Sequence, residues 1–158
     1  MAGIKTNAMR LLDSQKVPYH VFTYDSKDGK NDGVSVAEKI KKDPGVVFKT
    51  LVAQGSTRNL FVFLVQVEDE LDLKKAAKAA GEKKIEMLPV KDLQKHTGYI
   101  RGGCSPLGMK KQYPTIIDLK AETLEQMIVS AGKIGFQVEL APKDLQSLTH
   151  AVFADVRK

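Results

Sequence analysis

Tryptophan is absent from the 158 residues of this chain, and only 6% of the residues are aromatic. A single cysteine, Cys104, excludes an internal disulfide and any metal site built from several cysteines. No stretch approaches the ~20 consecutive apolar residues of a membrane helix, and residues 1–7 lack the apolar core of a secretory signal. We therefore expect a cytoplasmic protein that makes no membrane contact and carries out no redox chemistry.

The remaining composition is that of an ordinary globular domain, with 42% hydrophobic and 28% charged residues. At this length we expect one compact domain spanning residues 1–158. Lys and Arg outnumber Asp and Glu by 25 to 19, which gives a formal charge of +6. Such a charge favours polyanionic partners such as RNA, although solubility alone explains a charge of this size.

Hydrophobic periodicity predicts an α+β fold with a mixed sheet, because strands and helices interleave without a regular alternation. Two apolar runs with a polar turn between them predict a central hairpin. A capping pattern at Ser35 to Glu38 predicts a helix start, and Gly81 ends a later helix. Strands are expected over residues 19–24, 46–53, 60–67, 115–119, 126–130, 135–140 and 151–156, and helices over 6–17, 35–42, 73–80, 90–96 and from 142.

Lys49 is the first candidate for a functional role, because it is the only charge in the apolar run 46–52. An ammonium in a partly dry cleft could hold a phosphate or stabilise the oxyanion of an acyl transfer. A lysine at a strand edge that prevents aggregation is the alternative, and spacing alone favours it.

The second candidate is the loop 102–108, whose glycines and proline let backbone N–H groups approach an anion closely. Its spacing fits neither a nucleophile elbow nor a phosphate-binding loop. Cys104 or Ser105 could act as a nucleophile, but each would need a base, and only His96 and His150 lie nearby or downstream.

The three histidines are far apart in the sequence and have no carboxylate cluster beside them, so we expect no metal and no cofactor. Several lysines on and beside the helix 73–80 could contact a phosphate backbone, but a solvated helix face explains them nearly as well.

Several motifs in the same order resemble those of the YbaK/EbsC family over almost the whole chain. The family also includes the editing insertion domain of bacterial prolyl-tRNA synthetases. The segments that carry the resemblance are residues 48–51 (FKTL), 71–77 (LDLKKAA), 84–87 (KIEM) and 98–108 (GYIRGGCSPLG).

The resemblance implies a single α+β domain with a barrel-like mixed sheet flanked by helices, no metal or cofactor, and hydrolysis of mischarged Cys-tRNA(Pro). It also implies a transient association with prolyl-tRNA synthetase. Lys49 would be the essential catalytic residue. The residues implied to bind the substrate are Tyr24, Thr50, Gly102, Gly103, Ser105, Pro106, Gly108 and Ser130.

In such enzymes the thiol of the bound cysteinyl group attacks its own ester, so that no protein nucleophile is needed. Two positions depart from the family pattern: Cys104 replaces a small aliphatic residue, and Gln137 replaces an acidic group found in some relatives. Two alternatives stay open: a deacylase for another mischarged tRNA such as Ala-tRNA(Pro), and a non-catalytic module that binds tRNA or a synthetase.

Overall fold

The computed structural model of the protein describes residues 4–158, and its strands form two sheets. The α-helices are α1 (Asn7–Ser14), α2 (Gly33–Lys39), α3 (Leu73–Ala80), α4 (Val90–Thr97) and α5 (Pro142–Thr149), and the 3-10 helices are η1 (Pro44–Val46) and η2 (Leu119–Thr123). The strands are β1 (His20–Thr23), β2 (Phe48–Gly55), β3 (Leu60–Gln66), β4 (Ile85–Met87), β5 (Thr115–Asp118), β6 (Met127–Ser130), β7 (Phe136–Leu140) and β8 (Val152–Ala154).

The larger sheet has the strand order β4-β2-β3-β5-β8 and mixes antiparallel with parallel pairs. The predicted hairpin is confirmed, since β2 and β3 pair antiparallel from Phe48↔Gln66 to Gln54↔Leu60. The smaller sheet, β1-β7-β6, is antiparallel. The expected α+β class with a mixed sheet is confirmed, but among the described residues the two sheets stay open and form no closed barrel.

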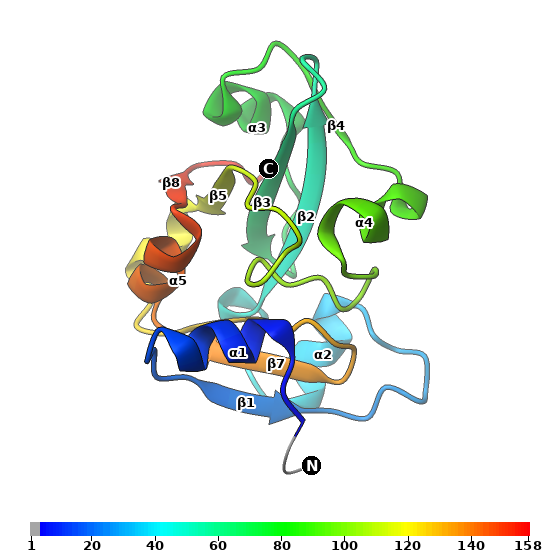
Figure 1. The fold of residues 1–158 in the computed structure, drawn as a ribbon, viewed down its shortest axis with the longest axis vertical. Helices are drawn as coiled ribbons and strands as arrows, with labels where there is room; N and C mark the ends of the chain where they lie inside the picture. The colour runs from blue at the N-terminus through cyan, green and yellow to red at the C-terminus, as the bar shows by residue number, and fades with distance from the viewer. Residues whose placement is uncertain (1–3) are drawn as a thin grey trace.

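Helices cover both faces of each sheet: α1 and α2 pack on opposite faces of the smaller sheet, and α3 and α4 pack on opposite faces of the larger one (Figure 1). Amphipathic α1 lies on the smaller sheet and buries Ala8, Met9 and Leu12 against β6 and β7. On the larger sheet, α3 buries Ala76 and Ala77 against the β3 residues Phe61, Phe63 and Val65. At ~25 cal/mol per Å², burial of these apolar faces is the main term that stabilises the arrangement.

Several predicted boundaries are wrong by one to three residues, and two of them have a clear local cause. Helix α2 begins at Gly33 and not at Ser35, because the Asp32 carboxylate caps it by accepting from the Ser35 N–H at 3.2 Å. Gly33 packs directly against Val67, the residue after β3, and an added Cβ would clash with the Val67 side chain. Strand β2 begins at Phe48, because Asp43 caps the short turn η1 before it.

The short strand β4 was not predicted, because three residues with one buried side chain carry too little periodic signal. It pairs only with Ala53, Gln54 and Gly55 of β2. Throughout residues 4–158 every helix is too short and too polar to cross a bilayer.

Candidate active site

A small cavity lies where the two sheets meet. Val47, which directly precedes β2, forms one parallel bridge with Ile128 of β6. Because β4 pairs only with the far end of β2, the edge of β2 at Lys49 and Thr50 is left open beside Ser130. The cavity beside this open edge has a volume of ≈ 110 Å³.

Lys49 carries the only charge among the described residues that line this cavity. The lining comes from the polar loop after β1, from α2, from the starts of β2 and the glycine-rich loop, and from β6 and β7. Its residues are Tyr24, Asn31, Gly33, Val36, Val47, Phe48, Lys49, Thr50, Val67, Gly102, Cys104, Ser130 and Gln137. A cavity of ~150 Å³ holds one benzene, so this one fits a small amino-acid side chain better than a nucleoside.

Strand geometry directs the backbone of Thr50 toward the open edge of β2. In an antiparallel pair, alternate residues turn both N–H and C=O away from the partner strand. The Val47 C=O accepts from Val67 N–H in the direction of β3, whereas the Val52 C=O accepts from Leu88 N–H on the other side. Thr50 is in phase with Val52, so its N–H faces the edge at which the cavity lies. An N–H in this position suits a developing oxyanion.

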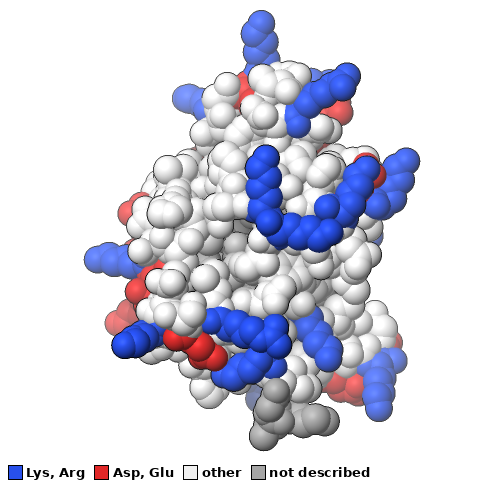
Figure 2. Space-filling model, viewed as in Figure 1, with Lys and Arg blue, Asp and Glu red and all other residues white. Residues whose placement is uncertain are grey.

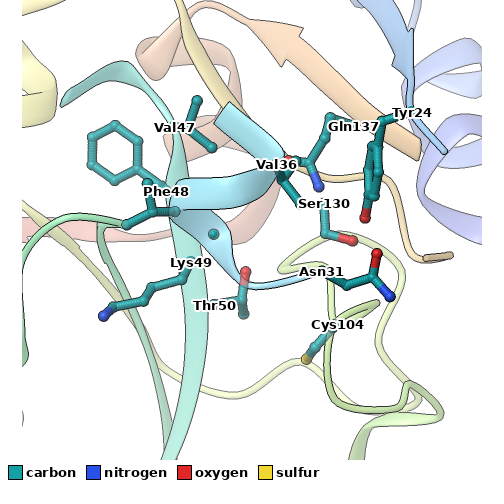
Figure 3. Close-up of a pocket in the computed structure, with 13 residues that line it drawn as sticks. Tyr24, Asn31, Val36, Val47, Phe48, Lys49, Thr50, Cys104, Ser130 and Gln137 are labelled. Carbon is teal, nitrogen blue, oxygen red and sulfur yellow. The ribbon is translucent and has the colours of Figure 1, made fainter. Parts of the chain in front are cut away.

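Three buried polar atoms at the cavity have no hydrogen-bond partner within the described chain: Tyr24 Oη, Asn31 Oδ1 and Thr50 Oγ1. Figure 3 shows Tyr24, Asn31, Ser130 and Gln137 gathered on one side of β2, with the Thr50 side chain toward them. Leaving a buried polar atom without a partner costs ~1–3 kcal/mol. These atoms therefore indicate a polar ligand that would supply the missing hydrogen bonds.

The loop that presents Asn31 is fixed in place by Lys39. Its ammonium donates to Asp25 O at 2.7 Å, Asp28 Oδ1 at 2.8 Å and Lys30 O at 2.8 Å. The hydrogen bond from Lys39 Nζ to Asp28 Oδ1 is the largest cause of the lowered pKa of the Asp28 carboxyl. Sequence reasoning did not single out Asn31, because a turn-forming residue in a turn carries no distinguishing signal.

The Lys49 side chain extends from β2 away from the polar cluster (Figure 3). Its neighbour in the ladder is Val65, on the face covered by α3, whereas Thr50 lies on the opposite face. The pKa of the Glu70 carboxyl is lowered mainly by its hydrogen bond with Lys158, and the positive charge of Lys49 also lowers it. Lys49 thus lines the cavity from its rim, and its amine lies on the outer side.

Of the predicted substrate-binding residues, Tyr24, Thr50, Gly102 and Ser130 line the cavity together with Lys49. The structure does not place four others in the lining. Gly103 and Gly108 allow close packing: an added Cβ would lie 3.1 Å from the Ile134 N and 3.0 Å from the Tyr99 hydroxyl, respectively. The members of the loop outside the lining are Gly103, Ser105, Pro106 and Gly108.

Cys104 borders the cavity with its thiol buried, and burial raises the pKa of that thiol to about 12. A raised pKa keeps the thiol protonated and therefore poorly nucleophilic at neutral pH. His96, the base considered for it, lines a different cavity. Ser105 is fully buried, and its hydroxyl accepts the Leu107 N–H at 3.2 Å.

Cys104→Ser is therefore expected to keep kcat within about threefold of the parent for any reaction at this site. The folded protein should resist alkylation by iodoacetamide at pH 8 and react readily in denaturant, as thiol mass labelling would show. Fast labelling of the folded protein together with loss of turnover in Cys104→Ser would instead identify a protein nucleophile.

Removal of a hydroxyl that has no partner should stabilise the fold while impairing the site. Tyr24→Phe is expected to leave the free energy of unfolding unchanged or to raise it by up to ~1 kcal/mol, as urea denaturation would measure. The matched control is Tyr99→Phe, because the buried Tyr99 hydroxyl donates to Leu107 O at 2.6 Å. The control should destabilise by ~1–2 kcal/mol. Equal destabilisation by both changes would contradict the assignment of Tyr24 to ligand binding.

No histidine or carboxylate lines the cavity in the part of the chain that the structure describes. Over residues 4–158, no group of three or more His, Cys, Asp or Glu side chains is arranged to hold a metal ion. The site thus offers hydroxyl, amide and backbone donors and one cation, which can orient a substrate and stabilise negative charge.

Comparison with known proteins relates the chain to translation. Residues 31–148 match the sequence model of the aminoacyl-tRNA editing domain. The chain is 49% identical, over 152 residues, to a protein of Enterococcus faecalis named as a candidate Cys-tRNA(Pro)/Cys-tRNA(Cys) deacylase, EbsC. That alignment covers 96% of this chain and 93% of the relative.

Solved structures share the fold. The hypothetical protein APE2540 superposes with a TM-score of 0.87 at 16% identity, covering 97% of this chain and 100% of that one. A candidate trans-editing enzyme for prolyl-tRNA synthetase superposes with a TM-score of 0.83 at 22% identity, covering 99% of each chain. At these identities the similarity establishes the architecture only.

Proposed function

Because this chain belongs to the aminoacyl-tRNA editing domain family, we propose that it deacylates mischarged Cys-tRNA(Pro), with Cys-tRNA(Cys) as a second substrate. The observation that carries the proposal is the cavity at the open edge of β2. It is small, and within residues 4–158 it holds three polar atoms without partners and one charge, the cation Lys49. A small aminoacyl ester at the end of a polyanion matches these properties. The 49% identity to the enterococcal relative supports the same substrate.

In the proposed complex the aminoacyl group occupies the cavity and the terminal nucleotide stays outside. Tyr24, Asn31 and Gln137 hydrogen-bond to the amino-acid end, and the N–H of Thr50 stabilises the oxyanion. Lys49 binds a phosphate of the terminal nucleotide at the rim, which the outward course of its side chain supports. Gly102 lines the same cavity and lets the substrate approach the backbone.

The reaction we propose uses the substrate's own thiol. The cysteinyl sulfur attacks the ester carbonyl, the bond from that carbon to the ribose oxygen breaks, and the ribose oxygen takes up the proton that the thiol loses. Such an intramolecular attack has a large effective molarity. The lack of a histidine or carboxylate in the described lining supports this route, because attack by water would call for a general base.

The proposals on domain organisation, on the glycine-rich loop and on the partner protein also come from membership of this family. We propose that residues 1–158 form one editing domain that acts on aminoacyl-tRNA in the cytoplasm. Gly103, Ser105, Pro106 and Gly108 shape the loop beside the substrate and do not contact it directly, which their place outside the cavity supports. A domain of this size cannot reach both ends of a tRNA, so transient association with prolyl-tRNA synthetase would supply tRNA selectivity.

A deacylation assay on the purified protein tests the function. Cys-, Ala- and Pro-charged tRNA(Pro) are compared at equal concentration, and loss of the labelled amino acid is followed. Rapid loss from Cys-tRNA(Pro) alone is expected. Preference for Ala-tRNA(Pro) would point to attack by water, and binding of charged tRNA without cleavage would point to a non-catalytic module.

A further inference from the structure

A second, larger cavity of ≈ 490 Å³ lies at the turn of the β2–β3 hairpin, away from the proposed active site. Its size falls within the ~300–1,000 Å³ range of ordinary ligand pockets. No acidic residue lines it among those that the structure describes. Its lining consists of Arg58, Asn59, Leu60, Phe61, His96, Lys111, Gln112, Tyr113 and Pro114.

The two cavities border one packed unit. Val52, Leu60 and Val62 lie on the same face of the hairpin as Thr50 and form a cluster with Cys104 and Tyr113 from the covering loop. Cys104 lines the first cavity, and Leu60 and Tyr113 line the second. The distance along β2 from Thr50 to Gln54 is about 14 Å, at ~3.4 Å per strand residue. Gln54 pairs with Leu60, which lines the second cavity. That distance equals roughly four stacked nucleotides at ~3.4 Å each.

Arg58 is held at the mouth of the second cavity in an uncommon backbone conformation. Its φ of 74° lies in the left-handed region, which Gly or Asn adopts at lower cost. The conformation is fixed on both sides, because Arg58 N–H donates to Gly55 O at 2.9 Å and Gln54 Nε2 donates to Arg58 O at 3.2 Å. A hairpin loop often needs one such residue, and here the position carries an exposed cation.

The opposite wall of the second cavity is equally ordered. The Tyr113 hydroxyl donates to the His96 carbonyl at 2.8 Å, and Lys111 Nζ lies 5.8 Å from the centre of the Tyr113 ring. Glu82 is not part of this lining, and its carboxylate is held beside the hairpin turn, where it accepts from Thr57 Oγ1 at 2.7 Å and from the Thr57 N–H at 3.1 Å. Figure 2 shows Lys and Arg side chains gathered on this face over α4 and the loop before β5.

We propose that this second cavity binds phosphates of the single-stranded 3′ end of the tRNA, a few nucleotides before the ester. Arg58 and Lys111 supply the positive charge, and the packed cluster between the cavities sets the spacing. This inference rests on the proposed function, which places the aminoacyl ester in the first cavity. The competing location for RNA contact is the lysine-bearing face of α3, where Lys74 and Lys78 are exposed but line neither of the two cavities.

The test compares two double variants that remove equal charge. Arg58→Asn with Lys111→Gln alters the cavity, and Asn tolerates the left-handed backbone. Lys74→Gln with Lys78→Gln alters α3. Affinity for uncharged tRNA is measured as a function of salt by filter binding. The cavity variant is expected to bind about tenfold more weakly, with a salt slope smaller by about two because two phosphate contacts are lost. The α3 variant should bind like the parent.

A second substrate locates the contact. On tRNA that lacks its single-stranded 3′ end, the cavity variant and the parent should bind equally. On charged tRNA the cavity variant should raise KM and leave kcat unchanged. Lys111→Gln alone, at an exposed position, should give part of the same effect and guards against misfolding.

An equal loss of affinity on the shortened tRNA, or a greater loss from the α3 variant, would overturn the proposal. If the parent protein binds tRNA through this cavity but leaves the ester intact, the proposed function fails and the RNA site stands. If both the parent and the cavity variant deacylate charged tRNA with the same kcat and KM, the proposed RNA site is wrong and the proposed function stands.

Discussion

Lys49→Ala is expected to lower kcat/KM for Cys-tRNA(Pro) by about 10²-fold or more while leaving most of the affinity for tRNA. Loss of one preorganised charge or positioning contact at an acyl-transfer site typically costs ~10²–10³-fold. Affinity should fall far less, because many phosphate contacts share the binding energy. Single-turnover deacylation and filter binding on the same preparation measure the two quantities.

Two further variants give this prediction its control. Lys49→Arg keeps the positive charge at the rim and should retain more activity than Lys49→Ala, although a guanidinium does not reproduce the shape of an ammonium. Lys78→Ala removes a lysine from the exposed face of α3 and should leave kcat/KM unchanged. Full activity of Lys49→Ala would remove Lys49 from the mechanism.

The sequence predicts the fold well wherever periodicity is strong. Strand β3 is apolar and fully buried, and α3 carries both a capping Asp72 and a terminal Gly81, so their existence and ends are local properties. Strand β4 depends instead on pairing with the far end of β2, and the first turn of α2 packs through Gly33 against Val67. Such tertiary contacts leave no period in the sequence.

The candidate site shows the same division. Lys49 stands out as a lone charge in an apolar run, and Gly102 belongs to an unusual loop, so both can be singled out beforehand. The direction of the Lys49 side chain follows from its place in the ladder opposite Val65, which no composition rule provides. Asn31 and the N–H of Thr50 become visible only when a polar atom without a partner and an open strand edge are located in space.

The open edge also explains why the site lies where it does. Strand β2 pairs with β3 from Phe48 to Gln54 and with β4 at one end, and Val47, just before its other end, bridges to β6. Between these attachments the outward N–H of Thr50 has no strand partner among residues 4–158. Rigid anchors on both sides hold this donor in position, as electrostatic stabilisation of a transition state requires.

The identity of the attacking group has the second large expected effect. Ser-tRNA(Pro) and Ala-tRNA(Pro) are expected to be deacylated at least ~10²-fold more slowly than Cys-tRNA(Pro). Serine differs from cysteine by one atom and fits the same cavity, but its hydroxyl is far less acidic and no histidine or carboxylate in the described lining can activate it. Alanine lacks the group altogether, and the advantage of intramolecular attack disappears with it.

The test of the attacking group has to measure the affinity for each charged tRNA and the rate of the chemical step separately. All three charged tRNAs should bind with similar affinity, because the phosphate backbone dominates, so the difference should lie in the single-turnover rate. The Cys-tRNA reaction should slow as its thiol is blocked by alkylation beforehand, whereas a water-dependent site would tolerate any modification that the cavity accommodates. Equal rates on cysteine and serine esters would show that the protein supplies the activation itself, and the donors around Thr50 would then have to orient a water molecule.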